Sequence, residues 1–141
     1  MIENIIYSVL KNDGELAVLL GATAEDSRIY AVYANPLKLP CVVFYGSAPV
    51  SPNDTPWLYS QNITFEIYAE TAAEFGNIRN RFYEIFQKYD RFFNSEAFKT
   101  QGIIIKECHA VSAQSVSTFP EEIEQGVSGV ISFDFQFTKC A

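Results

Sequence analysis

The sequence has 141 residues, 48% of them hydrophobic, and a formal net charge of −7 at pH 7. This length is typical of a single domain, and such a chain buries enough surface to fold without a metal ion or a disulfide. The acidic balance argues against nonspecific binding to DNA or to an anionic membrane as the main task, because both need a basic surface.

The N-terminal residues predict two short helices. The first is indicated by apolar residues at helical spacing, and it is expected to end at the Asn-Asp-Gly run of residues 12–14. Those apolar residues are Ile2, Ile5, Ile6, Val9 and Leu10. Residues 15–20 then predict a short second helical turn, which Gly21 closes in the C′ position.

Two strands and a long connection follow. Residues 28–33 predict a short strand, which the Asn-Pro pair at 35–36 ends. Residues 41–46 are apolar with valines at the centre, which is typical of an inner strand with moderate burial on both faces. Residues 47–56 hold three prolines and are too long for a tight turn, so they predict a projecting loop or an extended hairpin arm. We expect Trp57, at the base of this arm, to anchor it to the core.

The centre of the chain is a strand that leads directly into a helix. Apolar and polar residues alternate in residues 59–69, the pattern of a strand with one buried face. The apolar set is Ile63, Phe65, Ile67 and Ala69. Thr71 stands at the helix N-cap position with Glu74 three residues later, which predicts a capping box.

The helix that begins there carries one apolar stripe. The stripe consists of Phe75, Ile78, Phe82, Ile85, Phe86 and Tyr89. Polar and charged residues fall largely off it, namely Asn77, Arg79, Asn80, Arg81, Glu84 and Lys88. A strand and a helix with one apolar face each are expected to fold back so that the two faces meet.

The last third of the chain predicts a connector, two strands and a second long loop. Residues 90–101 form a polar-aromatic connector, and residues 103–111 form a strand. On this strand one face is expected to hold Ile103, Ile105 and Glu107, and the other Ile104, Lys106 and Cys108. Residues 112–126 predict a loop that is rich in serine and then acidic, and residues 127–138 alternate strictly as a closing strand.

Together these elements predict one α+β domain over residues 1–141. We expect a mostly antiparallel sheet of about five strands, two main helices packed on one face, and long projecting loops. No stretch approaches the roughly 20 apolar residues of a membrane span, and the first residues lack the features of a signal peptide. The sequence therefore predicts a soluble protein made in the cytosol.

Residue types that carry catalysis or bind metals are sparse. Cys41, Cys108 and Cys140 are far apart and lack C-x-x-C spacing, so we expect neither a disulfide framework nor a zinc site, and a reducing compartment is favoured. His109 follows Cys108 on a strand, where neighbours point to opposite faces, so the two cannot form a nucleophilic pair. The acidic residues 121–124 lack the ligand spacing of a Ca²⁺ loop, and no glycine run matches a phosphate-binding loop. We expect no enzyme activity, no cofactor and no metal.

The order of the elements carries a family resemblance. A helix, a leucine-rich turn and a tyrosine-containing strand precede the run Leu39-Pro40-Cys41-Val42-Val43-Phe44-Tyr45. After a polar loop come the strand from Ile63 to Ala69 and the helix that begins at Thr71. This order resembles the tail terminator proteins, also called tail completion or tail-to-head joining proteins, of long-tailed bacteriophages and prophages. The resemblance covers residues 2–89 well and the final strands loosely.

Membership of that family implies a structural rather than an enzymatic role. The subunit would assemble with copies of itself as a hexameric ring, although it can be monomeric before assembly. The ring would cap the tail tube at its final length and offer a surface to the head connector or stopper protein. DNA would only pass through the channel, no membrane would be involved, and the protein would act in the bacterial host cytoplasm and then at the neck end of the virion tail.

The two long loops are the natural candidates for contacts with neighbouring subunits and with the tube. The candidate residues are Pro49, Ser51, Pro52, Asn53, Asp54, Trp57, Ser115, Phe119, Glu121, Glu122 and Glu124. The three glutamates also give rise to a hypothesis, that acidic side chains line a channel through which DNA slides without sticking.

Two other classes remain open from the sequence. One is another virion assembly factor, such as a head-completion or neck protein or a tail-tube subunit. The other is a non-viral ligand-binding α+β domain, in which the aromatic-lined face of the sheet would hold a small molecule.

Overall fold

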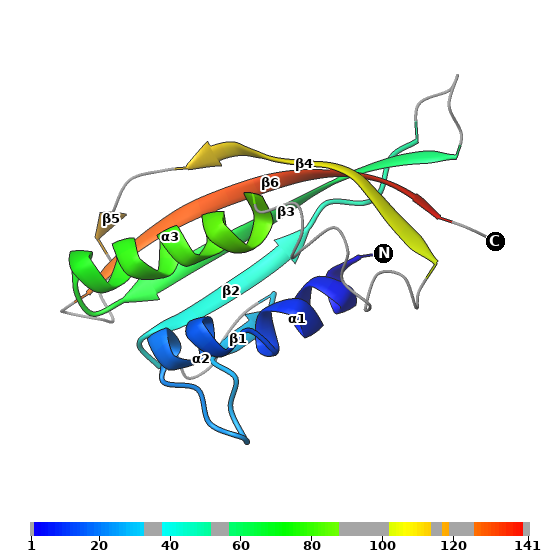
Figure 1. Ribbon diagram of the computed structural model, residues 1–141. Coiled ribbons are helices and arrows are strands. Elements are labelled where there is room, and N and C mark those ends of the chain that lie inside the picture. The colour runs from blue at the N-terminus through cyan, green and yellow to red at the C-terminus, as the bar shows by residue number, and fades with distance from the viewer. Residues whose placement is uncertain are drawn as a thin grey trace.

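Three helices and an open, mostly antiparallel sheet make up the part of the chain that the structure describes. The computed structural model describes residues 2–32, 38–51, 57–87, 102–113, 117–118 and 126–139. In chain order the elements are α1 (Glu3–Lys11), α2 (Gly14–Leu20), β1 (Ile29–Ala31), β2 (Cys41–Gly46), β3 (Leu58–Ala69), α3 (Ala72–Gln87), β4 (Ile103–Ala113), β5 (Ser117–Thr118) and β6 (Val127–Lys139) (Figure 1).

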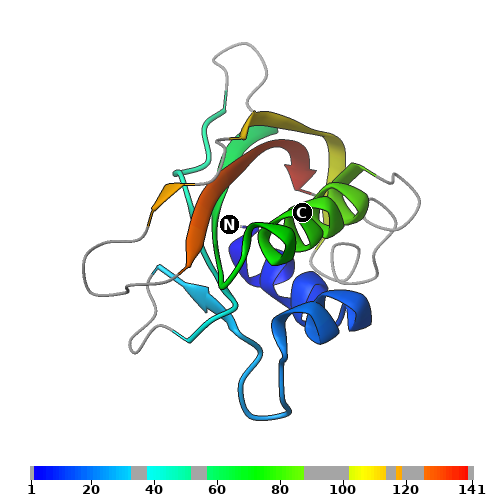
Figure 2. The same ribbon diagram turned by 90° about the vertical axis from the view of Figure 1, so that its left-hand side faces the viewer.

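The strands lie side by side in the order β1-β2-β3-β6-β4, and the short β5 pairs with the beginning of β6. The pairing of β1 with β2 is parallel, whereas the other pairs described are antiparallel. All three helices lie on one side of the curved sheet (Figure 2). The predicted α+β class and the mostly antiparallel sheet with helices on one face are confirmed.

The core forms between this face of the sheet and the helices. The pairing of β3 with β6 runs from Leu58 opposite Thr138 to Ala69 opposite Val127. Because residues directly opposite one another share a face, the alternating apolar residues of both strands point to the helices together. The fully buried members are Ile63, Phe65, Ile67, Ala69, Phe133, Phe135 and Phe137. The predicted alternation of both strands is therefore confirmed.

Aromatic rings from the sheet and from α3 meet in this core. The ring centroids of Phe65 and Phe82 are 4.8 Å apart, as are those of Phe86 and Phe133. Tilted and edge-to-face pairs of this kind add stability beyond the burial of their area. The predicted apolar stripe is thus the surface that packs against the sheet from Phe75 to Phe86, and its last member, Tyr89, lies outside the described residues.

Side-chain caps begin both α2 and α3. The backbone N–H of Leu16 donates to Asp13 Oδ2 at 2.9 Å, and Gly21 ends α2 with a φ of 66°. Asp13, which the sequence placed at the end of the first helix, therefore begins the second. At α3 the N–H of Glu74 donates to Thr71 Oγ1 at 3.1 Å, as predicted, but Glu74 Oε1 accepts from the N–H of Glu70 at 2.9 Å.

A register shift on β4 corrects the predicted faces of this strand. The pairing with β6 slips between Ile105 and Glu107, so Ile105 lies opposite Phe137 and Cys108 opposite Phe135. Cys108 therefore faces the core together with Ile105, and the alternation expected for Glu107 and Cys108 is wrong. The physical reason is a β-bulge, which inserts one extra residue and turns the following side chains to the other face, as far as the second shift between Ala110 and Ser112.

The structure describes little of the chain predicted to form the connector at 90–101 and the second long loop at 112–126. The connector at 90–101 lies outside the described residues. Of the loop expected at 112–126, residues 112–113 continue β4 and residues 117–118 form β5. The first of these strands is therefore longer than its sequence pattern indicated.

Candidate interaction surfaces

One end of the sheet extends beyond the strands next to it. Gly46, the last residue of β2, lies opposite Ile63, so residues 58–62 of β3 continue past β2. The chain after β2 follows them, because the N–H of Ser47 donates to the carbonyl of Asn62 at 2.9 Å. Val50 and Ser60 exchange two further backbone hydrogen bonds of 2.8 and 2.9 Å. The segment after β2 is thus an extended hairpin arm as far as residue 51.

Apolar side chains gather at this end of the sheet. Val50 lies opposite Ser60, and both Leu58 and Ile104 lie opposite Thr138. These pairings place Val50, Leu58 and Ile104 on the sheet face that points away from the helices. Val50 and Trp57 are each 62% exposed, and Ile104 is 47% exposed. We call the four residues Val50, Trp57, Leu58 and Ile104 the distal patch.

Trp57 does not anchor the arm to the core, and that prediction is wrong. The indole belongs to the turn that precedes β3, one residue before the first pair of the ladder. It is therefore outside the alternation that directs β3 side chains into the core. Its exposure shows that the indole is not packed in the core, and its role as a contact residue stays a prediction.

The structure places the predicted contact residues only in part. Pro49 and Ser51 are half-buried and flank Val50, so they share the arm with Trp57. The others lie outside the described residues: Pro52, Asn53, Asp54, Ser115, Phe119, Glu121, Glu122 and Glu124. Sequence reasoning did not single out Val50, Leu58 or Ile104. The signal for Ile104 was present, since it points away from its buried neighbours Ile103 and Ile105.

Next to the distal patch, the face of the sheet away from the helices is polar. Asn62 Nδ2 donates to Asp134 Oδ1 at 2.8 Å, and Thr64 Oγ1 donates to Asn62 Oδ1 at 3.2 Å. The hydroxyls of Thr64 and Ser132 lie 3.0 Å apart. These polar groups bond to one another across β3 and β6, which gives a rigid polar surface.

Two tyrosines hold Glu66 on the same face. The hydroxyls of Tyr45 and Tyr68 donate to Glu66 Oε1 and Oε2 at 3.2 and 2.8 Å. Burial, followed by the effects of Glu66, raises the pKa of both tyrosines above the ordinary value. Both hydroxyls therefore remain protonated donors at neutral pH, and they are engaged by the protein itself.

At the other end of the molecule, the corner between α1 and α2 is fixed to α3 by Arg81. Its guanidinium donates to both oxygens of Asp13, with Nε–Oδ2 at 2.8 Å and Nη2–Oδ1 at 2.6 Å. Nη1 lies 2.8 Å from Glu84 Oε2 and 3.0 Å from Glu15 Oε2. Arg81 is only 6% exposed, although the sequence pattern placed it off the apolar stripe of the helix. Hydrogen bonding to Asp13 is the main reason that its pKa is raised.

The helix held by this corner presents a second apolar surface. Val18 is 81% exposed, and with Gly14, Glu15 and Leu19 it lines an open depression of about 590 Å³. We call these four residues the α2 patch. Leu19 is partly buried against the core, so the patch rests on a packed base.

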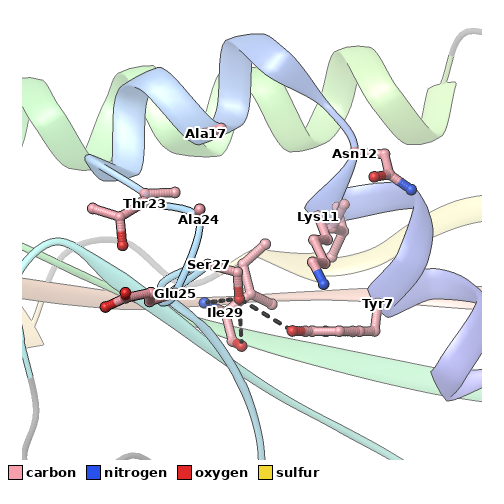
Figure 3. A pocket seen from close by; sticks show the side chains of 11 residues that line it. Tyr7, Lys11, Asn12, Ala17, Thr23, Ala24, Glu25, Ser27 and Ile29 are labelled. Atoms are coloured by element: carbon pink, nitrogen blue, oxygen red, sulfur yellow. Dashed lines mark hydrogen bonds between the residues drawn. The ribbon is translucent and has the colours of Figure 1, made fainter.

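A separate cavity of about 350 Å³ lies between α1, α2 and the segment before β1 (Figure 3). The Lys11 ammonium lies 5.9 Å from the centre of the Tyr7 ring, and the Tyr7 hydroxyl is 3.2 Å from Ser27 Oγ. Thr23 and Glu25 add further polar atoms to the wall. This cavity is not the aromatic sheet face that the ligand-binding alternative requires.

The cysteines that the structure describes are poor nucleophiles. Burial raises the pKa of the Cys41 and Cys108 thiols to about 12, and thiolates are the reactive form. Across residues 2–32, 38–51, 57–87, 102–113, 117–118 and 126–139, no group of three or more His, Cys, Asp and Glu residues is placed to hold a metal ion. Within the same ranges, every helix is too short or too polar to cross a membrane.

Comparison with known proteins adds no relative. No protein-family model matches the chain, and no curated protein matches it significantly. The fold is that of a small α+β domain with two exposed apolar patches. These surfaces and the order of elements in the sequence are the grounds on which a function can be proposed.

Proposed function

We propose that this chain is a structural subunit of a bacteriophage or prophage tail, of the tail terminator class. In this role it assembles as a hexameric ring, caps the tail tube at its final length and presents a surface to the head connector. The work of such a subunit is binding and assembly, without catalysis and without a cofactor. It acts in the host cytoplasm during assembly and stays at the neck end of the tail.

The observation that carries the proposal is the distal patch. Monomeric proteins normally leave apolar side chains exposed singly, whereas contiguous apolar patches mark contacts with other molecules. Here Val50, Trp57 and Ile104 are each exposed at the end of the sheet where β3 continues past β2. Val50 lies on the arm, Trp57 in the turn before β3, and Ile104 on β4, with Thr138 between Ile104 and Leu58. An arm with an apolar end fits a subunit that must hold neighbours in an assembly.

The edges of the sheet also favour contacts through side chains over the pairing of edge strands from two copies. In the described part of the sheet the outer strands are β1, which has three residues, and β4. The register of β4 shifts twice along its length, between Ile105 and Glu107 and between Ala110 and Ser112. Bulges and short edge strands oppose edge-to-edge pairing of sheets. Assembly of this subunit is therefore expected to proceed through patches.

The proposal is tested by the length of tail tubes. The tube protein encoded in the same phage or prophage is polymerised with and without the purified chain, and tube lengths are measured by negative-stain microscopy. We expect added chain to shorten the tubes and to appear at one end of each tube. The matched variants are Trp57→Ser in the distal patch and Val32→Ser, which removes an exposed valine elsewhere. Unchanged lengths and bare ends with the wild-type chain would contradict the proposal.

A further inference from the structure

The two apolar patches lie at opposite ends of the molecule. Figure 1 shows the beginnings of β3 and β4 running past α3 at one end, with α2 at the other end. Neither patch can therefore cover the other within one chain. Both are built on rigid supports, since the distal patch belongs to a paired ladder and the α2 patch to a helix whose corner is fixed by Arg81.

We propose that the distal patch of one copy docks on the α2 patch of the next copy. Such a head-to-tail contact joins two different surfaces, and it generates a closed ring when the rotation between copies closes. The inference rests on the proposed function for ring closure, and it adds which surfaces form the ring. Val18 and Leu19 would receive the apolar side chains of the arm.

Charge favours this pairing over contacts between identical patches. Glu15 lines the α2 patch with 70% of its side chain exposed, and it shares the Arg81 guanidinium with Asp13 and Glu84, so this corner keeps an excess of negative charge. The exposed Lys106 lies two residues from Ile104. A head-to-tail contact brings Lys106 of one copy toward Glu15 of the next. Two α2 patches facing one another would instead oppose two glutamates, which is unfavourable. The occupant of the α2 patch is thus a second copy of this chain.

Complementation between two variants tests the contact directly. Val18→Asp spoils the α2 patch, and Ile104→Asp spoils the distal patch. Each variant alone is expected to stay monomeric in multi-angle light scattering at concentrations where the wild-type chain assembles. A one-to-one mixture retains a single intact contact, between the distal patch of the first variant and the α2 patch of the second. We therefore expect the mixture to form dimers and no rings.

Controls separate this contact from misfolding. Val32→Asp changes another exposed valine, 69% exposed, and should assemble as the wild type does. Thermal unfolding followed by circular dichroism must give similar midpoints for all variants. As a second test, Lys106→Glu is expected to weaken assembly at least tenfold, whereas Lys106→Arg, which keeps the charge, should assemble as the wild type does.

Several outcomes would overturn the head-to-tail contact. They are full assembly of either single variant, a mixture that stays monomeric while the wild type assembles, or a wild-type chain that is monomeric at every concentration. None of these decides the proposed function, because capping of tail tubes is measured separately. A chain that assembles through these patches and leaves tubes uncapped would instead contradict the function and keep the contact.

Discussion

Arg81 is buried, although the sequence pattern places it off the apolar stripe of α3. The guanidinium is buried because Asp13, in the corner between α1 and α2, accepts two of its hydrogen bonds. A buried guanidinium is tolerated only when its donors are paired, and the planar fork of arginine matches a carboxylate in a way that lysine does not. Arg81 therefore joins α3 to Asp13, which lies 68 residues earlier in the sequence at the corner between α1 and α2.

Replacing Arg81 tests whether this junction holds the helices in place. Arg81→Met keeps an apolar stem of the side chain but leaves Asp13 without its partner. We expect the free energy of unfolding in urea to fall by about 2–3 kcal/mol, at the lower end for a buried pair because two of the partners are partly exposed. Arg79→Met, on the same helix, is the control and should cost less than about 1 kcal/mol. Equal losses for the two variants would show that Arg81 has no special role.

Asp26 gives the fold an acid-dependent component. The Tyr30 hydroxyl donates to both of its oxygens, at 2.8 and 3.0 Å, and the N–H of Arg28 donates at 3.0 Å. These bonds, that of the Arg28 backbone foremost, lower the pKa of Asp26. Because the pKa is lower in the folded than in the unfolded state, the stabilisation is present above about pH 4 and is lost as the pH falls through the folded value.

Asp26→Asn should accordingly remove part of the pH dependence of stability. We expect urea unfolding of this variant to vary less between about pH 5 and pH 2 than that of the wild type, with a constant difference between about pH 6 and pH 8. Glu25→Gln changes the neighbouring exposed carboxyl and serves as the control. If the stability of the Asp26→Asn variant changes with pH as steeply as that of the wild type, these hydrogen bonds do not contribute to the pH dependence of folding.

For helices and strands, the sequence predicts those features that depend on residues close together in the chain. Strict alternation in β3 and β6 and the Thr71 cap of α3 depend on local spacing, and the structure confirms both. The bulge of β4 and the burial of Arg81 depend on partners distant in sequence, so local periodicity cannot reveal them. The candidate site divides in the same way. Prolines indicated the arm, whereas the register of neighbouring strands is what brings Ile104 to the same end and face of the sheet as Val50.

The attachment of α1 to the hairpin depends on Gly46. Gln61 Nε2 donates to Glu3 Oε1 at 2.7 Å and to the carbonyl of Ser47 at 2.9 Å, and Gly46 lies beside this junction. A Cβ on Gly46 would meet Ile63 Cδ1 at 2.7 Å, Glu3 Oε1 at 3.0 Å and Gln61 Nε2 at 3.1 Å.

We therefore expect Gly46→Ala to destabilise the fold by about 1–3 kcal/mol, because the added methyl group overpacks the site. The measurement is the midpoint of thermal unfolding. Gly14→Ala is the matched control, since a Cβ there meets nothing within 4 Å. It should be neutral or slightly stabilising. An unchanged midpoint for Gly46→Ala would contradict this expectation. It would mean that α1 and the hairpin move apart to admit the methyl group without any loss of stability.

For the whole molecule, the acidic balance leads to a prediction about DNA. Glu121, Glu122 and Glu124 lie outside the described residues, and the hypothesis from the sequence is that they line a channel through which DNA passes. Changing all three to lysine should leave assembly intact and slow DNA passage, because basic side chains hold phosphates. Infectivity of particles that carry the variant is the measurement, and unchanged infectivity would contradict the hypothesis.

Copies of this chain are proposed to form a ring through surfaces at opposite ends of the fold. The most direct test is the mass of the purified wild-type chain by light scattering, with negative-stain images of the same samples at low and high concentration. We predict closed rings of about six subunits, with monomers favoured on dilution. A chain that is monomeric at every concentration would contradict the contact between copies, and a chain that also fails to bind preassembled tail tubes would contradict the proposed function as well.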